Sequence, residues 1–382
     1  MVFRLCFPKV NISGAGALAS VPDELIGAGF KRPLIVTDKV LVGLGVVEPL
    51  LAGLAAKGLK AKVFDGVVPN PTVKEVGEGF AAFRDHDADS LIAVGGGSPI
   101  DTAKAIRILS ANPGPITLYN GVGKVGKEGA FLIAVNTTAG TAAEVTSNAV
   151  ITDTAAGYKM VIIDAKIIPN ISVNDPEMMT GIPAATTAAT GMDALTHAIE
   201  AYVAKGAHIL TDHAALESIR IISAWLPKAV ENGADLQARE MMAYGQFVAG
   251  LAFNSAGLGC VHAMAHQPGA LKNLPHGVCN AILLPVVSAF NRPHAVARFA
   301  RIAAAMGVDT SAMSEETASL AAIDAIRALS AKVGIPKGFS VFGVTEADLP
   351  LWVTQAQQDP CAPGNPVAIS DAEMLELYRE AL

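Results

Sequence analysis

Histidines are concentrated in one short stretch of the chain. His262, His266 and His276 lie within the twenty residues GCVHAMAHQPGALKNLPHGV (259–278), although the whole chain of 382 residues has only eight histidines. Most of their neighbours are Gly, Ala, Leu and Val, among which a buried polar ring without a partner is costly. A bound ligand would supply such a partner, so this stretch is the first candidate for chemistry.

A second candidate segment is ATGMDALTHAIEAY (189–202), in which Asp193 and His197 are four residues apart. Residues at this spacing are neighbours on one face of a helix, and His262 and His266 have the same spacing. Taken alone, the Asp193–His197 pair is more typical of a hydrogen bond that stabilises a helix. Together, one carboxylate and three imidazoles from the two segments predict a site for a divalent cation.

The residue types narrow the choice of metal chemistry. His262 and His266 match the outer histidines of the HExxH zinc-protease pattern, but Ala263 stands where the glutamate base would be, so that class is excluded. The predicted site has no thiolate, and nothing therefore selects zinc as a structural ion. Oxygen and imidazole ligands suit Fe(II), Zn(II), Ni(II) or Mn(II), and the residue types leave that choice open.

A glycine-rich turn is a candidate phosphate site. In SLIAVGGGSPIDTAKAIRIL (90–109), a buried strand pattern runs into Gly95, Gly96 and Gly97 and then into a helical pattern. Glycines let the backbone approach a ligand closely, Ser98 is expected to cap the helix, and the N–H groups of a helix start attract phosphate. The motif is not GxGxxG, and a purely structural turn is an equally good interpretation.

A second turn of the same layout carries hydroxyl groups. In FLIAVNTTAGTAAEVT, the side chains of Thr137, Thr138 and Thr141 are candidates for hydrogen bonds to a pyrophosphate or a ribose. The alternative is a helix start at which Thr141 and Glu144 form a capping box. Two such turns in one sheet favour a nucleotide over a structural role.

Asp38 ends the apolar run LIVTD. An acidic residue at such a position accepts a hydrogen bond from a ribose 2′-hydroxyl and repels a 2′-phosphate, which favours NAD over NADP. A helix-capping aspartate is the alternative interpretation.

Two kinds of segment must position these residues. Apolar runs typical of buried parallel strands alternate with helical patterns in the first half, and helical periodicity alone continues to Leu382. We therefore predict an α/β dinucleotide-binding domain with a parallel sheet over residues 1–182 and an all-helical metal-binding domain over residues 183–382. The predicted strands are 32–38, 60–66, 90–98, 131–138, 159–164 and 170–175, and the first predicted helices are 47–58 and 73–87.

Composition excludes several classes of protein. A net charge of −7 without a basic run argues against a nucleic-acid partner. The four cysteines are scattered, which predicts free thiols in a cytoplasmic protein, and the N-terminal residues lack a secretion-signal pattern. The stretch 241–271 has no charged residue, but its histidines, amides and glycines predict a pair of buried core helices and no membrane partner.

These motifs resemble those of a known family. The segments GGGSPIDTAKAI, NTTAGTAAEVT, ATGMDALTHAIEAY and GLGCVHAMAHQPGALKNLPHGVCNAILLP are similar to the iron-containing (group III) alcohol dehydrogenases, over almost the whole chain. The resemblance implies the iron alcohol dehydrogenase fold, which dehydroquinate synthase shares. It also implies NAD, Fe(II) or a substituting divalent ion such as Zn(II), and a homodimer or larger homo-oligomer.

The resemblance also implies roles for individual residues. Asp193, His197, His262 and His276 would hold the metal, and His266 would lie beside it as a catalytic proton relay. The NAD site would consist of Asp38, Gly96, Gly97, Ser98, Asp101, Thr137, Thr138, Thr141 and Lys159. The substrate pocket would be lined by Asn70, Asn148, Phe253 and Cys361.

The expected activity is hydride transfer between NAD(H) and a short-chain alcohol or aldehyde. The segments LIVTDKVLVGLGVV, FDGVVPNPT and DPCAPGNP resemble the lactaldehyde reductases of the family, which act on L-1,2-propanediol. The alternative is a general dehydrogenase of ethanol, butanol or 1,3-propanediol. A cyclisation enzyme of the dehydroquinate synthase type and a non-catalytic metal or nucleotide sensor are rival classes, which an alcohol panel would separate.

Overall fold

The computed structural model describes residues 2–382, and its contacts divide the chain into two compact units. The α/β unit consists of Cys6–Thr138 and Ala142–Thr180. The helical unit consists of Gly181–Leu382, together with Ala139–Thr141 and the N-terminal residues up to Leu5. The predicted fold class, an α/β part with a parallel sheet followed by an all-helical part, is confirmed.

A six-stranded sheet, parallel throughout, forms the centre of the α/β unit, with the strand order β1-β9-β6-β4-β2-β3. The strands are β1 (Val10–Ser13), β2 (Pro33–Asp38), β3 (Lys62–Val67), β4 (Ser90–Gly95), β6 (Phe131–Asn136) and β9 (Ile171–Asn174). All but β1 lie where the apolar runs predict them. The edge strand β1 is mostly exposed, so its sequence VNIS lacks the apolar run of a buried strand.

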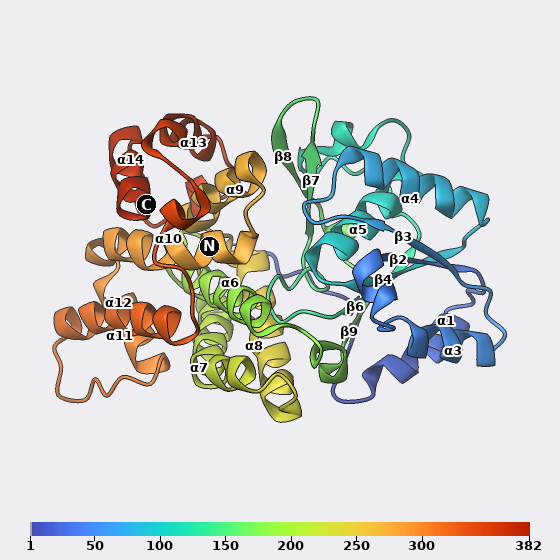
Figure 1. Cartoon of the computed structure of the whole chain (residues 1–382), viewed down its shortest axis with the longest axis horizontal. Helices are drawn as coiled ribbons and strands as arrows, with labels where there is room; N and C mark the ends of the chain where they lie inside the picture. The colour runs from blue at the N-terminus through green and yellow to red at the C-terminus, as the bar shows by residue number, and fades with distance from the viewer. Residues whose placement is uncertain (1) are drawn as a thin grey trace. The chain divides into compact units, whose positions relative to one another are not determined.

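Alternate residues along these strands face two separate helix layers. Ile92 of β4 packs with α1 and α3 on one face of the sheet, and Leu91 packs with α5 on the other. Figure 1 shows α1 and α3 on the side of the strands away from α4 and α5. The helices are α1 (Val21–Gly27), α2 (Lys39–Gly43), α3 (Glu48–Ala56), α4 (Val73–Asp85) and α5 (Gly97–Ala111). Cover on both faces explains why the strands are almost continuously apolar.

A second, three-stranded sheet lies in the same unit, with the order β5-β8-β7. Its strands are β5 (Gly121–Val122), β7 (Asn148–Asp153) and β8 (Tyr158–Ile163). The strand predicted at 159–164 therefore exists, but its expected place in the parallel sheet is wrong. β7 and β8 are antiparallel because a short turn joins them, and parallel neighbours would need a much longer crossover.

The helical unit is built around α6, which packs against α7, α8 and α10 and is buried on almost every side (Figure 1). Its helices are α6 (Ala184–Val203), α7 (Ile209–Glu231), α8 (Leu236–Ala256), α9 (Cys260–Lys272), α10 (His276–Asn291), α11 (Val296–Ala305), α12 (Glu315–Lys332), α13 (Leu349–Gln357) and α14 (Asp371–Glu380). A helix that is apolar on all sides belongs in a core, so polar residues on α6 need partners there.

The uncharged stretch 241–271 forms parts of α8 and α9, as predicted for a helix pair. The two helices are bent by 106° where α8 ends and α9 begins. Within the described residues no single helix is long and apolar enough to cross a membrane. The bent pair of α8 and α9 reaches that length and apolar composition only when the two helices are taken together.

Candidate metal centre and coenzyme site

Three acidic or imidazole side chains of α6 lie in the core of the helical unit. Asp193, His197 and Glu200 are 2%, 5% and 2% exposed, and their spacings of four and three residues place them along one face of the helix. Such groups are rarely buried without partners. The hydrogen-bond partners of Asp193 and Glu200 come from α10 and α9.

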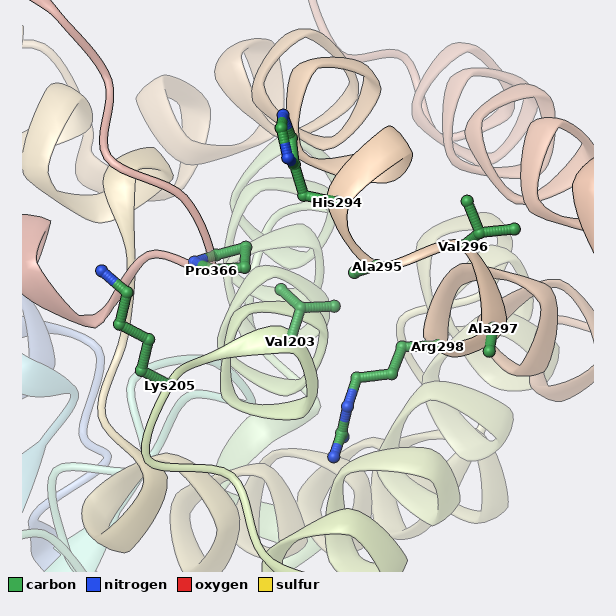
Figure 2. A pocket seen from close by; sticks show the side chains of 8 residues that line it. All are labelled: Val203, Lys205, His294, Ala295, Val296, Ala297, Arg298 and Pro366. Carbon is green, nitrogen blue, oxygen red and sulfur yellow. The ribbon is translucent and has the colours of Figure 1, made fainter.

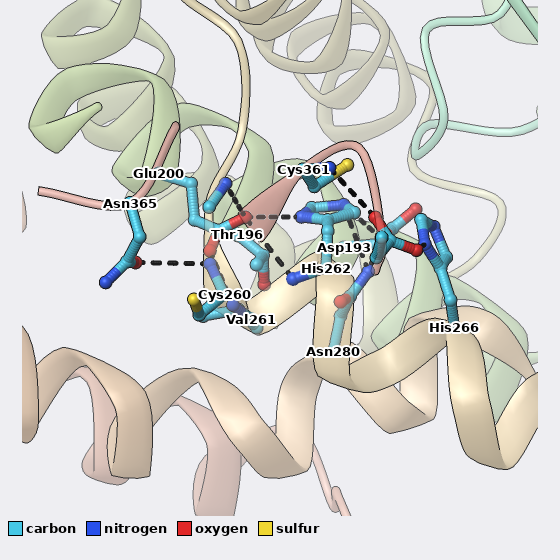
Figure 3. Close-up of polar contacts among 12 residues, drawn as sticks. Asp193, Thr196, Glu200, Cys260, Val261, His262, His266, Asn280, Cys361 and Asn365 are labelled. Carbon is cyan, nitrogen blue, oxygen red and sulfur yellow. Dashed lines mark hydrogen bonds and ion pairs between the residues drawn. The ribbon is translucent and has the colours of Figure 1, made fainter. Parts of the chain in front are cut away.

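Glu200 fixes the start of α9. The N-cap residue Gly259 offers no side chain, and the Glu200 carboxylate instead accepts the N–H groups of Gly259 at 3.0 Å and Val261 at 2.7 Å. Asn365 Oδ1 accepts the N–H of Cys260 at 3.1 Å (Figure 3). A Cβ on Gly259 would lie 2.8 Å from Asn365 Oδ1 and 2.9 Å from Glu200 Oε1, so only glycine fits there. α9 is thereby anchored to α6.

The same carboxylate orients His262. Its Nδ1 lies 2.7 Å from Glu200 Oε2, so a neutral ring donates through Nδ1 and keeps a lone pair on Nε2. Burial lowers the pKa of His262 well below its usual value, which favours this neutral form. Burial also raises the pKa of Glu200 to about 7, against the lowering effect of the N–H groups of Gly259, Val261 and His262.

Side chains from three helices converge on the amide nitrogen of Asn280. Nδ2 lies 2.6 Å from Asp193 Oδ1, 3.2 Å from His262 Nε2 and 3.0 Å from His276 Nε2. An amide nitrogen has two hydrogens, so it cannot satisfy three acceptors at once. Asp193 and His262 are buried and His276 is partly exposed, and one ligand atom from each of the three lies within 4.8 Å of the others, which fits a cation.

His197 lies beside this group of three. Its ring stacks on His262 and on Phe253, with centroid distances of 4.5 and 4.2 Å. Burial is the main cause that lowers the pKa of His197, against the charges of Asp193 and Glu200. Its Nδ1 is buried without a hydrogen-bond partner among the described residues, which also fits a ligand that the protein itself does not supply.

His266 has a different environment from the other three histidines. Its Nδ1 lies 2.7 Å from Asp359 Oδ2, and its ring stacks on His276 at 5.3 Å between centroids. Burial alone would raise the pKa of Asp359, but His266 and the hydrogen bonds of Cys361 outweigh it and leave the pKa below its usual value. The N–H of Cys361 donates to Asp359 Oδ1 at 2.9 Å, so the predicted pocket residue Cys361 lies next to His266.

The glycine turn lies at the carboxyl end of β4, against the turn after β6. A Cβ on Gly96 would lie 2.8 Å from Thr138 Oγ1, and Thr137 donates its N–H to the Gly95 carbonyl at 3.0 Å. Gly95 has φ +150°, which few other residues adopt. Thr138 Oγ1 is buried without a hydrogen-bond partner among the described residues, so this junction retains unused hydrogen-bonding capacity.

Two predictions for these turns are wrong. The N-cap of α5 is Gly96, which makes no side-chain cap, and Ser98 lies inside the first turn, where its carbonyl accepts from Thr102. The first N–H groups of α5 therefore remain available to an anion. No helix follows Thr141 before β7 begins at Asn148, so the capping-box alternative is also wrong. Thr141 belongs to the helical unit.

Asp38 is an N-cap whose second oxygen remains available. Its Oδ1 accepts the N–H groups of Val40 and Leu41 at 2.9 Å each, which confirms the capping interpretation. Oδ2 makes no hydrogen bond within the described residues, so capping does not prevent it from accepting a hydroxyl.

The remaining predicted residues of the α/β unit lie near one another. Asp101 accepts the N–H of Val150 at 3.0 Å, and burial raises its pKa to about 6 although Lys104 opposes the shift. Lys159 acts electrostatically on Asp101 and donates to Asn70 Oδ1 at 2.8 Å.

Asn148 begins β7, and its carbonyl accepts from Lys104 at 2.7 Å. Of the predicted substrate-pocket residues, this unit thus carries Asn70 and Asn148, and the helical unit carries Phe253 and Cys361.

Sequence reasoning missed three residues of the helical unit: Glu200, Asn280 and Asp359. Glu200 is three residues after His197 and Asn280 is four after His276, so the helical-neighbour rule could have found both. Asp359 has no such local signal, because its partner His266 is 93 residues away.

The hollow drawn in Figure 2 is separate from these residues. Its volume is about 430 Å³, and it lies between the end of α6 and the start of α11. Arg298 lines it, but its guanidinium is already bound to Asp212 and to the Tyr202 carbonyl. None of the predicted site residues borders this hollow.

Known proteins resemble the chain over its full length. The family model described as iron-containing alcohol dehydrogenase matches residues 8–176, and the C-terminal model of the Fe-containing alcohol dehydrogenase family matches residues 187–382. A lactaldehyde reductase of Escherichia coli (strain K12) is 46% identical, and the match covers 100% of both chains. An NAD-dependent methanol dehydrogenase of Bacillus methanolicus is 44% identical over 98% of each chain. Among solved structures, a 1,3-propanediol oxidoreductase has 44% identity and a TM-score of 0.98 over 100% of both chains. As its motifs predict, the chain belongs to the iron-containing alcohol dehydrogenase family.

Proposed function

We propose that this protein is a metal-dependent oxidoreductase that transfers hydride between NAD(H) and a short-chain alcohol or aldehyde. The observation that carries the proposal is the convergence of Asp193, His262 and His276 on one atom, Asn280 Nδ2. One ligand atom from each of these three residues lies within 4.8 Å of the others, and all three belong to the helical unit. Family membership supports the same conclusion.

The cation would be held by Asp193, His197, His262 and His276. The Asn280 amide nitrogen, which contacts three of these side chains, would have to turn aside first. A divalent cation in this position supplies Lewis acidity toward an alcohol or carbonyl oxygen. Glu200 keeps His262 neutral and aimed through Nε2, and the stacking of His197 between Phe253 and His262 limits its rotation. We propose Fe(II) as the ion, with Zn(II) or another divalent ion able to substitute, because the four ligands are nitrogen and oxygen atoms.

The α/β unit would hold the coenzyme at the carboxyl ends of β4 and β6. Gly96 and Gly97 leave the start of α5 uncapped for a pyrophosphate, with Ser98 in its first turn. Thr137 and Thr138 offer hydroxyl groups, and Asp101 and Lys159 lie on α5 and β8 of the same unit. Asp38 would accept the ribose hydroxyl through Oδ2, which favours NAD over NADP.

His266 would move the proton that the reaction releases or consumes. Its Nδ1–H donates to Asp359, which leaves Nε2 as the atom that accepts a proton from the alcohol side. The Asp359 carboxylate, held by the N–H of Cys361, then stabilises the charged ring. His266 thus needs no metal bond for its role.

For the substrate we propose 1,2-propanediol and lactaldehyde, with Phe253 and Cys361 among the residues of the helical unit that would contact it. The alternative is a general short-chain primary alcohol such as ethanol, butanol or 1,3-propanediol. The names of the relatives support both, since they include a lactaldehyde reductase and a methanol dehydrogenase at similar identity. We also propose a cytoplasmic location, which the four free cysteines support, and a homodimer or larger assembly, as the family resemblance implies.

A rate screen tests the proposal. Protein loaded separately with Fe(II) and with Zn(II) is assayed with NAD or NADH against short alcohols and aldehydes. We expect turnover of at least one short substrate, with kcat/KM highest for 1,2-propanediol or lactaldehyde, and almost none in Asp193→Ala. Absence of turnover with every alcohol, despite bound metal and NAD, would favour a sensor or a cyclisation enzyme and would overturn the proposal.

A further inference from the structure

His266, Asp359 and Cys361 form a second cluster of side chains that can bind metals. His266 belongs to α9, whereas the other two lie in the turn between α13 and the short helix η8 (Ala362–Gly364). One ligand atom from each residue lies within 4.8 Å of the other two. The side chains of His266 and Asp359 are only 9% and 8% exposed. The cluster is therefore already assembled and largely shielded from water.

The donor atoms of this cluster differ from those around Asn280. Imidazole, carboxylate and thiolate together suit a four-coordinate ion such as Zn²⁺ or Co²⁺, with water as the fourth ligand. The first group, Asp193, His262 and His276 (the Asp193 cluster), contains no sulfur. Asp359 and Cys361 are separated by a single proline in a turn, and the third donor comes from a distant helix. The geometry points to a second cation site, formed by His266, Asp359 and Cys361, that takes a thiophilic divalent ion when such an ion is in excess.

Filling this site needs one hydrogen bond to open. His266 Nδ1 and Asp359 Oδ2 are 2.7 Å apart, whereas two ligands about 2 Å from a tetrahedral zinc are roughly 3.3 Å apart. The Cys361 S–H bond breaks, a sulfur–metal bond forms, and the thiol proton passes to solvent. The His266 proton moves from Nδ1 to Nε2 as Nδ1 binds the ion. No electron is transferred, so no oxidant or reductant is needed.

Occupation of the second site has a consequence for turnover, which rests on the proposed function. With the proton on Nε2 and the metal on Nδ1, His266 can no longer accept a proton from the alcohol. A thiophilic ion in excess would therefore slow the reaction while the first cation stays in place. The second site would act as an inhibitory metal site.

Cobalt(II) tests the binding step without reference to activity. Iron(II)-loaded protein is titrated with Co²⁺ under anaerobic conditions, and the near-ultraviolet thiolate-to-cobalt charge-transfer band is followed. The Asp193 cluster has no thiolate, so the band reports only a site that contains cysteine. We expect the band to saturate at one added equivalent per chain, to vanish in Cys361→Ala and to weaken strongly in Asp359→Ala.

Cys6→Ala is the matched control, because Cys6 is another half-buried thiol outside the cluster, and it should keep the band. No band in the wild type, or a band that persists in Cys361→Ala, would overturn the proposed site. Turnover and retained iron are measured in the same titration. The rate of each variant is expressed relative to its own rate without cobalt. We expect a fall of about 100-fold as the band saturates. A saturated band with unchanged turnover would support the site and would overturn the relay role of His266.

Discussion

The Glu200→Gln variant tests how the candidate metal centre is held together. Glu200 Oε2 accepts the N–H of Gly259 at 3.0 Å and Nδ1–H of His262 at 2.7 Å, while Oε1 accepts the N–H of Val261 at 2.7 Å. A glutamine has only one acceptor oxygen. If that oxygen takes the Oε2 position, the amide N–H₂ group faces the N–H of Val261, and two donors oppose each other.

The expected losses of folding stability and of metal affinity follow from these contacts. One lost hydrogen bond in a buried position costs about 1–3 kcal/mol, and the bond to His262 loses its charge assistance. His262 then rotates more freely and its Nε2 is a weaker ligand. Changes to groups that support metal-binding histidines typically lower metal affinity by about 10–100-fold, and we expect that range here.

The assay is competition for Zn²⁺ between the protein and a chromophoric chelator, with thermal unfolding measured in parallel. Glu217→Gln, on the exposed surface of α7, is the matched control and should bind metal as the wild type does. A Glu200→Gln variant that is folded and binds zinc with unchanged affinity would refute the reasoning, because Glu200 would then have no influence on His262.

Three further results are expected. His266→Ala should lower kcat by about 100-fold while metal content stays near one ion per chain, as measured by elemental analysis, with His213→Ala on α7 as control; loss of the metal would mean that His266 is a ligand. Asp38→Asn keeps a capping side chain and removes the charge, so it should raise kcat/KM with NADP relative to NAD by about tenfold or more; an unchanged ratio would restrict Asp38 to capping. Because the folded pKa of Asp101 is raised from 3.8 to about 6, its contribution to stability is complete below pH 4 and is lost as the pH rises to 6. The unfolding temperature of wild type relative to Asp101→Asn should therefore be higher at pH 4.5 than at pH 6.5, and an equal difference at both pH values would contradict the raised pKa.

Local spacing in the sequence is enough to predict which helices carry the residues of the candidate site in the helical unit. His276 begins α10, as the preceding proline suggests, and His262 and His266 share α9 at a spacing of four. The same rule predicts Asp193 and His197 on α6. These predictions depend only on helix periodicity, which the sequence carries directly.

What the sequence could not reveal depends on contacts between distant segments. Glu200 caps a helix that begins 60 residues later, and Asp359 meets His266 across 93 residues. Gly96, two residues before Ser98, takes the N-cap position, because the chain leaves β4 at Gly95 in a conformation that suits glycine. The strand at 158–163 leaves the main sheet because a short turn returns the chain beside β7. Periodicity identifies elements, but it does not state which elements meet.

The central claim is that Asp193, His197, His262 and His276 share one divalent cation. Anomalous diffraction at the iron absorption edge, from crystals of iron(II)-loaded protein, tests it most directly. The account predicts one strong peak about 2.0–2.3 Å from an Asp193 oxygen and from a nitrogen of each of the three rings, with the Asn280 amide turned away. A crystal with full iron content whose peak lies elsewhere, or lacks these ligands, would contradict it.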